Sequence, residues 1–175
     1  MPVTALLRHG EVIGGTRFRG RSDDPLTPKG WRQMETALAS PRWTQVVTSP
    51  LRRCADFARD WGARHQLPVT VEPRLAELDF GAWEGRTPAE VHARWPAALA
   101  RFWNDPWQHP PPEGEDLTAF SQRVQAAWRD WHSQPGDILF VTHGGVIRML
   151  LAHLHDWPRQ RLLEIDVGYG ERVDL

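Results

Sequence analysis

Residues 2–10 read Pro-Val-Thr-Ala-Leu-Leu-Arg-His-Gly, an apolar run that stops at an arginine, a histidine and a glycine. Residues 138–144 read Ile-Leu-Phe-Val-Thr-His-Gly and repeat that pattern near the other end of the chain. Short apolar runs that end at glycine are typical of strands buried on both faces. We therefore predict two buried strands, each of which carries one histidine, His9 or His143, at its carboxyl end.

Strands alternate with helices along the rest of the chain. We predict further strands at residues 45–48, 69–71, 162–167 and 172–175, and helices at 28–39, 50–65, 87–103 (interrupted at Pro96), 116–132 and 146–155. Strands that alternate with helices, several of them apolar on both faces, indicate an α/β layer fold with a mostly parallel sheet.

The composition sets limits on the protein class. A length of 175 residues suits one domain, which we assign to residues 1–175. Cys54 is the only cysteine, which excludes an intrachain disulfide and a zinc ribbon. A net charge of −1 gives no strong field that would attract nucleic acid or an anionic membrane. The sequence does not indicate an oligomeric state.

Location is predicted from what the sequence does not contain. The first residues have neither the basic region nor the long apolar stretch of a signal peptide. No run approaches the roughly 18 apolar residues that span a membrane. We therefore expect a cytoplasmic enzyme that acts on a small molecule and binds neither nucleic acid nor membrane.

The two strand-end histidines suggest phosphoryl chemistry. Ligands of parallel sheets bind beyond the carboxyl ends of the strands, so His9 and His143 are expected to meet there. A neutral imidazole that faces a phosphate held by Arg8 is arranged to attack phosphorus, while the second histidine stabilises the phosphoryl oxygens. Each histidine could instead be satisfied by a backbone carbonyl. A zinc pair would need further ligands at a recognisable spacing, and His153 with His155 is read as a solvated pair.

Two other segments add charge to this predicted site. A helix begins near Ser49-Pro50, where one of Arg52 and Arg53 can face an anion at the helix N-terminus. Residues 77–85 place carboxylates in a loop with aromatic side chains, where a shielded carboxyl group could protonate a leaving oxygen. A surface acidic turn is an equally good interpretation of that loop.

Together these segments resemble the histidine phosphatase superfamily, also called the phosphoglycerate mutase-like family. The motifs occur in that family's order, from residue 4 to about 150. They are Arg8-His9-Gly10-Glu11, Asp24-Pro25-Leu26-Thr27-x-x-Gly30, Ser49-Pro50-Leu51-x-Arg53, Glu77-x-x-Phe80-Gly81-x-Trp83-Glu84-Gly85, Pro112-x-Gly114-Glu115 and Thr142-His143-Gly144-Gly145.

The resemblance implies a three-layer α/β/α sandwich and a reaction without metal or organic cofactor. His9 would become the phosphohistidine, and Arg8, Arg53 and His143 would form the phosphate pocket. Glu77 would donate a proton to the leaving group and then act as base when water hydrolyses the phosphoenzyme. The resemblance thus selects Arg53 over Arg52.

One loop departs from the family pattern. Many members carry a phosphate-contacting asparagine after the Arg-His-Gly-Glu motif, but this chain has Val-Ile-Gly-Gly at residues 12–15. Backbone N–H groups or Arg17 are the candidates to replace that contact. Cys54 stands where the family usually has alanine.

The substrate is predicted from the same loop. The chain is more compact than the mutases, and its residues 8–20 and 165–170 are similar to those of alpha-ribazole phosphatases of cobalamin synthesis. A flat benzimidazole could stack on Trp83, Trp103 or Trp107. A broad-specificity or sugar-phosphate phosphatase is the alternative within the family. An inactive relative that binds a phosphorylated ligand and a metal-dependent hydrolase are the alternatives from other classes.

Overall fold

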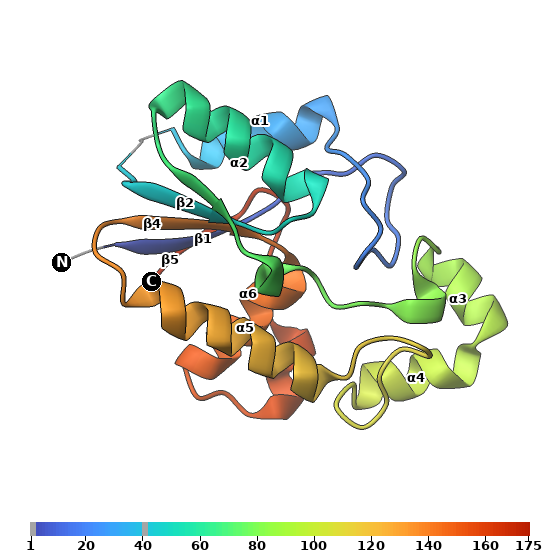
Figure 1. Ribbon diagram of the computed structural model, residues 1–175. Coiled ribbons are helices and arrows are strands. Elements are labelled where there is room, and N and C mark those ends of the chain that lie inside the picture. The colour runs from blue at the N-terminus through green and yellow to red at the C-terminus, as the bar shows by residue number, and fades with distance from the viewer. Residues whose placement is uncertain (1–2, 40–41) are drawn as a thin grey trace.

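The computed structural model describes residues 3–39 and 42–175, and a five-stranded sheet lies at its centre (Figure 1). The strand order is β3-β2-β4-β1-β5, and only β5 runs antiparallel to its neighbour. The predicted mostly parallel sheet is therefore confirmed, although Pro2 lies outside the described residues. The strands are β1 (Thr4–Arg8), β2 (Gln45–Thr48), β3 (Val69–Val71), β4 (Ile138–Thr142) and β5 (Arg172–Asp174).

Helices cover both faces of the sheet, as the three-layer prediction requires. Figure 1 shows α1 (Pro28–Ala37) and α2 (Arg52–His65) on one face and α5 (Leu117–His132) and α6 (Gly144–Leu154) on the other. The pair α3 (Pro88–Arg94) and α4 (Pro96–Asn104) lies apart from these layers. Three short 3₁₀ helices complete the structure: η1 (Pro73–Leu75), η2 (Gly81–Trp83) and η3 (Arg159–Glu164).

The strands are apolar on both faces because each face packs against a different layer of helices. Leu6 and Phe140 belong to the cluster that includes the apolar side chains of α5 and α6. Ala5, Leu7 and Val141 belong to the cluster that includes those of α1 and α2. Alternate residues of one strand thus point into two separate cores, as the period of two in a strand requires.

Helix boundaries follow the capping residues in the sequence. Thr27 caps α1, and Asp116 caps α5 by accepting two backbone hydrogen bonds. Thr87 and Glu90 form a capping box at the start of α3. The helical segment is interrupted before Pro96, because proline cannot donate the hydrogen bond that a continuous helix needs. Within the two described ranges, no helix combines the length and apolarity needed to cross a bilayer.

The strand predicted at residues 162–167 is wrong. Its first part is the 3₁₀ helix η3, which buries Leu162 in the core. The carbonyls of Ile165 and Val167 accept hydrogen bonds from the side chains of Arg148 and Arg8 rather than from a neighbouring strand. Arginine side chains have thus replaced the ladder partners that an apolar segment ordinarily finds in a sheet.

The strand register determines which side chains meet at the carboxyl edge of the sheet. Arg8 of β1 pairs with Thr142 of β4, and Thr48 of β2 pairs with Val141 of β4. The ladder continues one residue further, because the His9 amide donates to the carbonyl of Thr142 at 3.0 Å. The residues that follow β1, β2 and β4 are therefore neighbours.

The turn after β1 passes very close to the first turn of α1, and this contact gives a stability prediction. A Cβ on Gly30 would lie 2.2 Å from the carbonyl oxygen of Glu11. We expect Gly30→Ala to lower the free energy of unfolding by about 1–3 kcal/mol, because the backbone must move to relieve the overlap. Urea unfolding measures this change.

Gly168→Ala is the matched control, because the nearest atom to its Cβ would be a terminal oxygen of the flexible Glu171 side chain, at 3.3 Å. Equal stability of the two variants would contradict the prediction.

Candidate active site

His9 lies at the end of β1 with a ring that is buried and held in one tautomer. Its Nδ1 is 2.8 Å from the carbonyl oxygen of Gly10. A carbonyl can only accept, so Nδ1 carries the proton and the lone pair of the neutral ring is on Nε2. The side chain that was predicted to be the nucleophile therefore has one defined nucleophilic atom.

His143 follows β4 and is packed against His9, as the sequence predicted. The two ring centroids are 5.2 Å apart in an edge-to-face arrangement. His143 is fully buried, and its nitrogens contact the Oγ of Ser49 at 2.6 Å and the Nε of Arg53 at 3.3 Å. Residues after β1, β2 and β4 thus form one cluster.

Arg53 is fully buried in the first turn of α2, whereas Arg52 is exposed and pairs with Asp56. The choice of Arg53 as the inward arginine is therefore confirmed in its placement. Its guanidinium donates to the carbonyls of Gly20 at 2.9 Å and of Arg19 at 3.2 Å, and also to that of Ser22. The loop before α1 therefore surrounds this cation with carbonyl dipoles.

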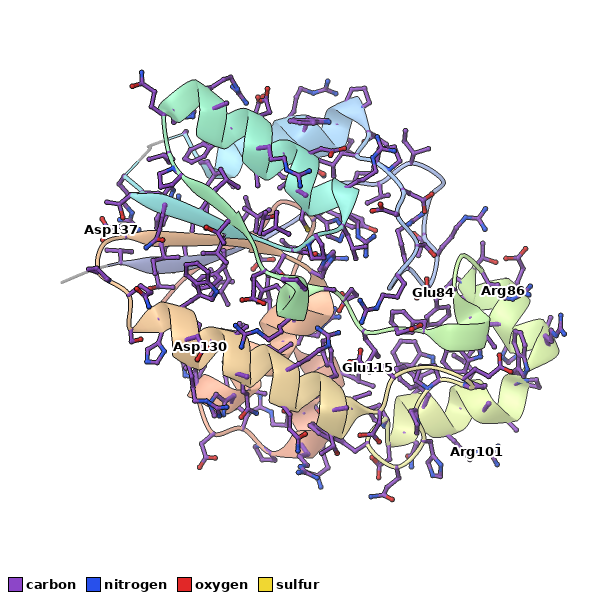
Figure 2. All side chains as sticks on the ribbon, viewed as in Figure 1. Glu84, Arg86, Arg101, Glu115, Asp130 and Asp137 are labelled. Atoms are coloured by element: carbon purple, nitrogen blue, oxygen red, sulfur yellow. The ribbon has the colours of Figure 1, made fainter. Side chains whose placement is uncertain are left out.

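Glu84 holds that loop in place. Figure 2 labels Glu84, which precedes α3; its carboxylate accepts the backbone N–H groups of Gly20, Arg21 and Ser22 and the hydroxyl of Ser22. These hydrogen bonds lower the pKa of Glu84 against the opposing effect of burial, which is the largest single influence. Glu84 thus acts on Arg53 through the loop, although the two side chains do not bond directly.

Arg8, the residue before His9, has one side-chain hydrogen-bond donor without a partner among the described residues. It donates to the carbonyl of Val167, and its guanidinium lies 4.3 Å from the centre of the Tyr169 ring. Its Nε is buried and has no hydrogen-bond partner among the described residues. A buried donor without a partner indicates a position where a ligand oxygen completes the site.

Burial and the neighbouring positive charges keep both histidines neutral. Burial, followed by the positive charge of Arg53, holds the pKa of His9 well below its usual range. The same two causes, in the same order, lower the pKa of His143. A neutral imidazole beside two arginines can attract an anion and still offer a lone pair to it.

Glu77 lies at the N-terminus of α6, on the far side of this cluster. One oxygen accepts from the Gly145 amide at 3.0 Å, and a Cβ on Gly145 would approach the other oxygen to 2.3 Å. Arg123 fixes the backbone here by donating to the carbonyl of Glu77, and it is paired in turn with Glu115, which Figure 2 labels. The carboxyl group that was predicted to be the proton donor is therefore held close enough for its charge to act on Arg8 and Arg53.

An apolar pocket begins at Glu77 and Gly145. Phe80, Trp103 and Phe120 are among its aromatic lining residues, and Arg148 is its cation. The remaining lining residues are Phe18, Leu78, Phe102, Leu117, Leu162 and Leu163. A carboxyl group beside an apolar pocket suits a substrate whose leaving group carries an apolar ring.

Only one of the three tryptophans considered for stacking reaches this pocket. Trp103 lines it and is 54% exposed. Trp83 has no exposed surface, because Phe18 and Phe102 pack against its indole, so its predicted contact with substrate is wrong. Trp107 lines neighbouring depressions and donates to the carbonyl of Arg159.

The glycine loop is organised by two arginines with different tasks. Arg17 donates to the carbonyls of Gly14 and Gly85 and is partly exposed, so its guanidinium braces the loop from outside. Arg19 is buried against Asp24, and its charge reaches His9. The positive charge that this loop brings to the site therefore comes from Arg19, and Arg17 is not placed to replace the missing asparagine contact.

Arg19, Tyr169 and Arg123 are functional candidates that sequence reasoning missed. A weak signal existed for Tyr169, because the tail at residues 165–170 stood out as a motif without an assigned task. Arg19 likewise lies in the motif at residues 8–20, but its pairing with Asp24 in an irregular loop could not be read from the sequence. Across residues 3–39 and 42–175, no three His, Cys, Asp or Glu side chains gather as possible metal ligands.

The chain is similar to known phosphatases over nearly its whole length. It is 34% identical to the adenosylcobalamin/alpha-ribazole phosphatase of Escherichia coli, over 97% of this chain and 88% of that protein. It is 33% identical to the glucosyl-3-phosphoglycerate phosphatase of Mycolicibacterium vanbaalenii, over 87% of this chain and 76% of that protein. The crystal structure of the alpha-ribazole phosphatase from Shigella flexneri superimposes with a TM-score of 0.84 at 32% identity, covering 98% of this chain and 89% of that one.

The family model for the histidine phosphatase superfamily (branch 1) matches residues 4–174. This match includes both strand-end histidines and every segment that contributes to the site. The chain belongs to the histidine phosphatase superfamily.

Proposed function

We propose that this protein is a phosphomonoesterase that works through a phosphohistidine at Nε2 of His9. The observation that carries the proposal is the tautomer of His9, whose protonated Nδ1 is tied to Gly10 so that the lone pair of Nε2 is free. That lone pair forms the N–P bond while the P–O bond to the leaving group breaks, and Glu77 gives its proton to the departing oxygen. The oxygen of a water molecule then bonds to phosphorus while the N–P bond breaks and its electron pair returns to Nε2, Glu77 takes the proton of that water, and phosphate leaves.

The positive groups of the site stabilise the negative charge of the phosphoryl oxygens as the N–P bond forms. Arg8 and Arg53 flank His9 and stay charged throughout, and the unpartnered Nε of Arg8 can donate to one of these oxygens. His143 lies against His9 and accepts a hydrogen bond from the Nε of Arg53, which orients that guanidinium. These groups are positioned before substrate arrives, so no reorganisation is needed at the moment of reaction.

Alpha-ribazole 5′-phosphate, or its corrinoid-linked equivalent, is the substrate we propose. Two of the relatives described above are alpha-ribazole phosphatases by name. The apolar pocket beside Glu77 supports the same substrate, because a benzimidazole is flat and apolar and can pack against Trp103 and Phe80. The product alcohol would leave through this pocket.

A sugar-phosphate phosphatase is the second candidate, because the mycobacterial relative carries that activity in its name. The pocket favours the aromatic substrate, since a sugar would leave most of its hydroxyl groups against apolar walls. An inactive ligand-binding relative is disfavoured because the nucleophile, the cations and the carboxyl group are all present and adjacent. The cytoplasmic location and the absence of nucleic-acid binding stay predictions from composition.

The first prediction concerns the phosphoenzyme. Wild-type protein quenched during turnover of a labelled phosphate monoester should carry acid-labile, base-stable phosphate, and His9→Ala should carry none and lose about 10⁴-fold or more in kcat. His153→Ala is the matched control because His153 is exposed on α6. Label on the His9→Ala protein would contradict the assignment.

The pH dependence follows from the neutral histidines. Because the pKa of His9 is lowered, the unprotonated form persists below pH 6.5, and the acid limb of kcat/KM should lie below that value. The free energy of unfolding should also fall as the pH falls below 6.5. In that interval the unfolded chain binds protons at these histidines, whereas the folded protein keeps them neutral. Circular dichroism at each pH separates loss of activity from unfolding, and an acid midpoint at or above 6.5 would refute the prediction.

Substrate choice is tested at the pocket. We expect Trp103→Ala to raise KM for alpha-ribazole 5′-phosphate about 3- to 10-fold, as the loss of one aromatic stacking contact predicts. KM for glycerol phosphate, which has no ring, should change little. Trp107→Ala is the control because Trp107 is outside the pocket lining. An unaltered KM for the aromatic substrate in Trp103→Ala would rule out stacking on this indole.

A further inference from the structure

A buried hydrogen-bond network lies behind His143, on the side away from His9. Ser49, Cys54 and His143 have no exposed surface. The Oγ of Ser49 is 2.6 Å from Nε2 of His143 and 3.3 Å from the amide nitrogen of Leu51. Because none of these groups contacts solvent, each hydrogen in the network must find its acceptor within the protein.

The position of one hydrogen follows from Arg53. Its Nε lies 3.3 Å from Nδ1 of His143, and a guanidinium nitrogen only donates. Nδ1 must therefore accept, because a proton there would face the N–H of Arg53. A neutral imidazole carries a single ring proton, so that proton is on Nε2 and points to the Oγ of Ser49.

Ser49 and Cys54 complete the network. Ser49 accepts from Nε2 of His143 and from the Leu51 amide. Burial raises the pKa of the Cys54 thiol to about 12, so the thiol keeps its proton and donates it to the carbonyl of Thr142 at 3.3 Å. The His143 ring proton, the Leu51 amide and the Cys54 thiol each have an acceptor when the proton of His143 is on Nε2.

We propose that Ser49 is a positioning residue for the reaction, whose hydroxyl accepts the Nε2 proton of His143 and thereby keeps Nδ1 unprotonated and turned toward Arg53. This inference rests on the proposed phosphatase function. Nδ1 then accepts from the Nε of Arg53, so that the orientation of this guanidinium is fixed before substrate binds.

Loss of the hydroxyl would disturb this arrangement in a defined way. Without Ser49, the Nε2 proton has no acceptor in a fully buried place, and an unpaired buried donor is unfavourable. The ring would relieve this by rotating or by moving the proton to Nδ1, and either change turns a donor toward Arg53. The cluster would therefore lose its alignment for the phosphoryl oxygens while the fold around it stays intact.

Ser49→Ala and Ser49→Thr, assayed on a phosphate monoester, test this role. We expect Ser49→Ala to lower kcat/KM by roughly 10- to 100-fold, as loss of a residue that orients another does, and Ser49→Thr, which keeps the hydroxyl, to restore it to within about threefold. Ser121→Ala is the matched control, because this serine hydroxyl is also buried and hydrogen-bonded but contacts Gln125.

A spectroscopic readout separates positioning from general structural damage. Long-range ¹H–¹⁵N spectra of the wild type should show His143 with its proton on Nε2, and this pattern should be lost in Ser49→Ala and kept in Ser49→Thr. If Ser49→Ala does not fold, the wild-type spectrum alone still shows whether the ring proton of His143 is on Nε2, as the inference requires.

Three outcomes would overturn the inference: a wild-type His143 with its proton on Nδ1, a folded Ser49→Ala with wild-type kcat/KM, or a Ser49→Thr as impaired as Ser49→Ala. Phosphoenzyme trapping on the same wild-type sample keeps the proposed function separate. A wild type that labels on His9 together with a fully active Ser49→Ala would contradict only the role of Ser49.

Discussion

The fully buried guanidinium of Arg53 is the constraint on which the rest of the site depends. Removing a charge from water costs several kcal/mol unless hydrogen bonds replace the water. Here carbonyls of the loop at residues 19–22 and Nδ1 of His143 make that replacement. Carbonyl dipoles solvate the cation without cancelling its charge, so the site keeps a positive potential that attracts an anion. Burial, together with this charge, keeps both histidines neutral.

That constraint explains why distant segments have to meet. The loop around Arg53 must itself be held, and Glu84 does so with a carboxylate that accepts several backbone N–H groups. The register of the parallel strands then brings His9 and His143 to the same edge as Arg53. The site divides into a charged half that suits a phosphoryl group and an apolar half beside Glu77 that suits its leaving group.

The places where sequence reasoning failed share one cause. Residues 162–167 were predicted as a strand, but arginine side chains from β1 and α6 hydrogen-bond to carbonyls of this segment. Trp83 belongs to an acidic, glycine-containing motif that could be a surface turn, yet its indole is fully buried and packs against Phe18 and Phe102. Both outcomes depend on partners far away in the chain, which neither periodicity nor propensity reports.

The sequence by itself determined the layers of the fold, the capped ends of α1, α3 and α5, the break at Pro96 and the set of side chains that reach the carboxyl edge of the sheet. These features follow from local chemistry: apolar runs, side-chain caps and the missing N–H of proline. Only the tertiary structure decided which atom of each histidine is free, that Arg19 and Tyr169 border the site, and that Trp103 rather than Trp83 lines the pocket. These features depend on hydrogen bonds and packing between segments as far apart as Arg8 and Val167, 159 residues along the chain, and the strand register that creates many of those contacts exists only in the folded chain.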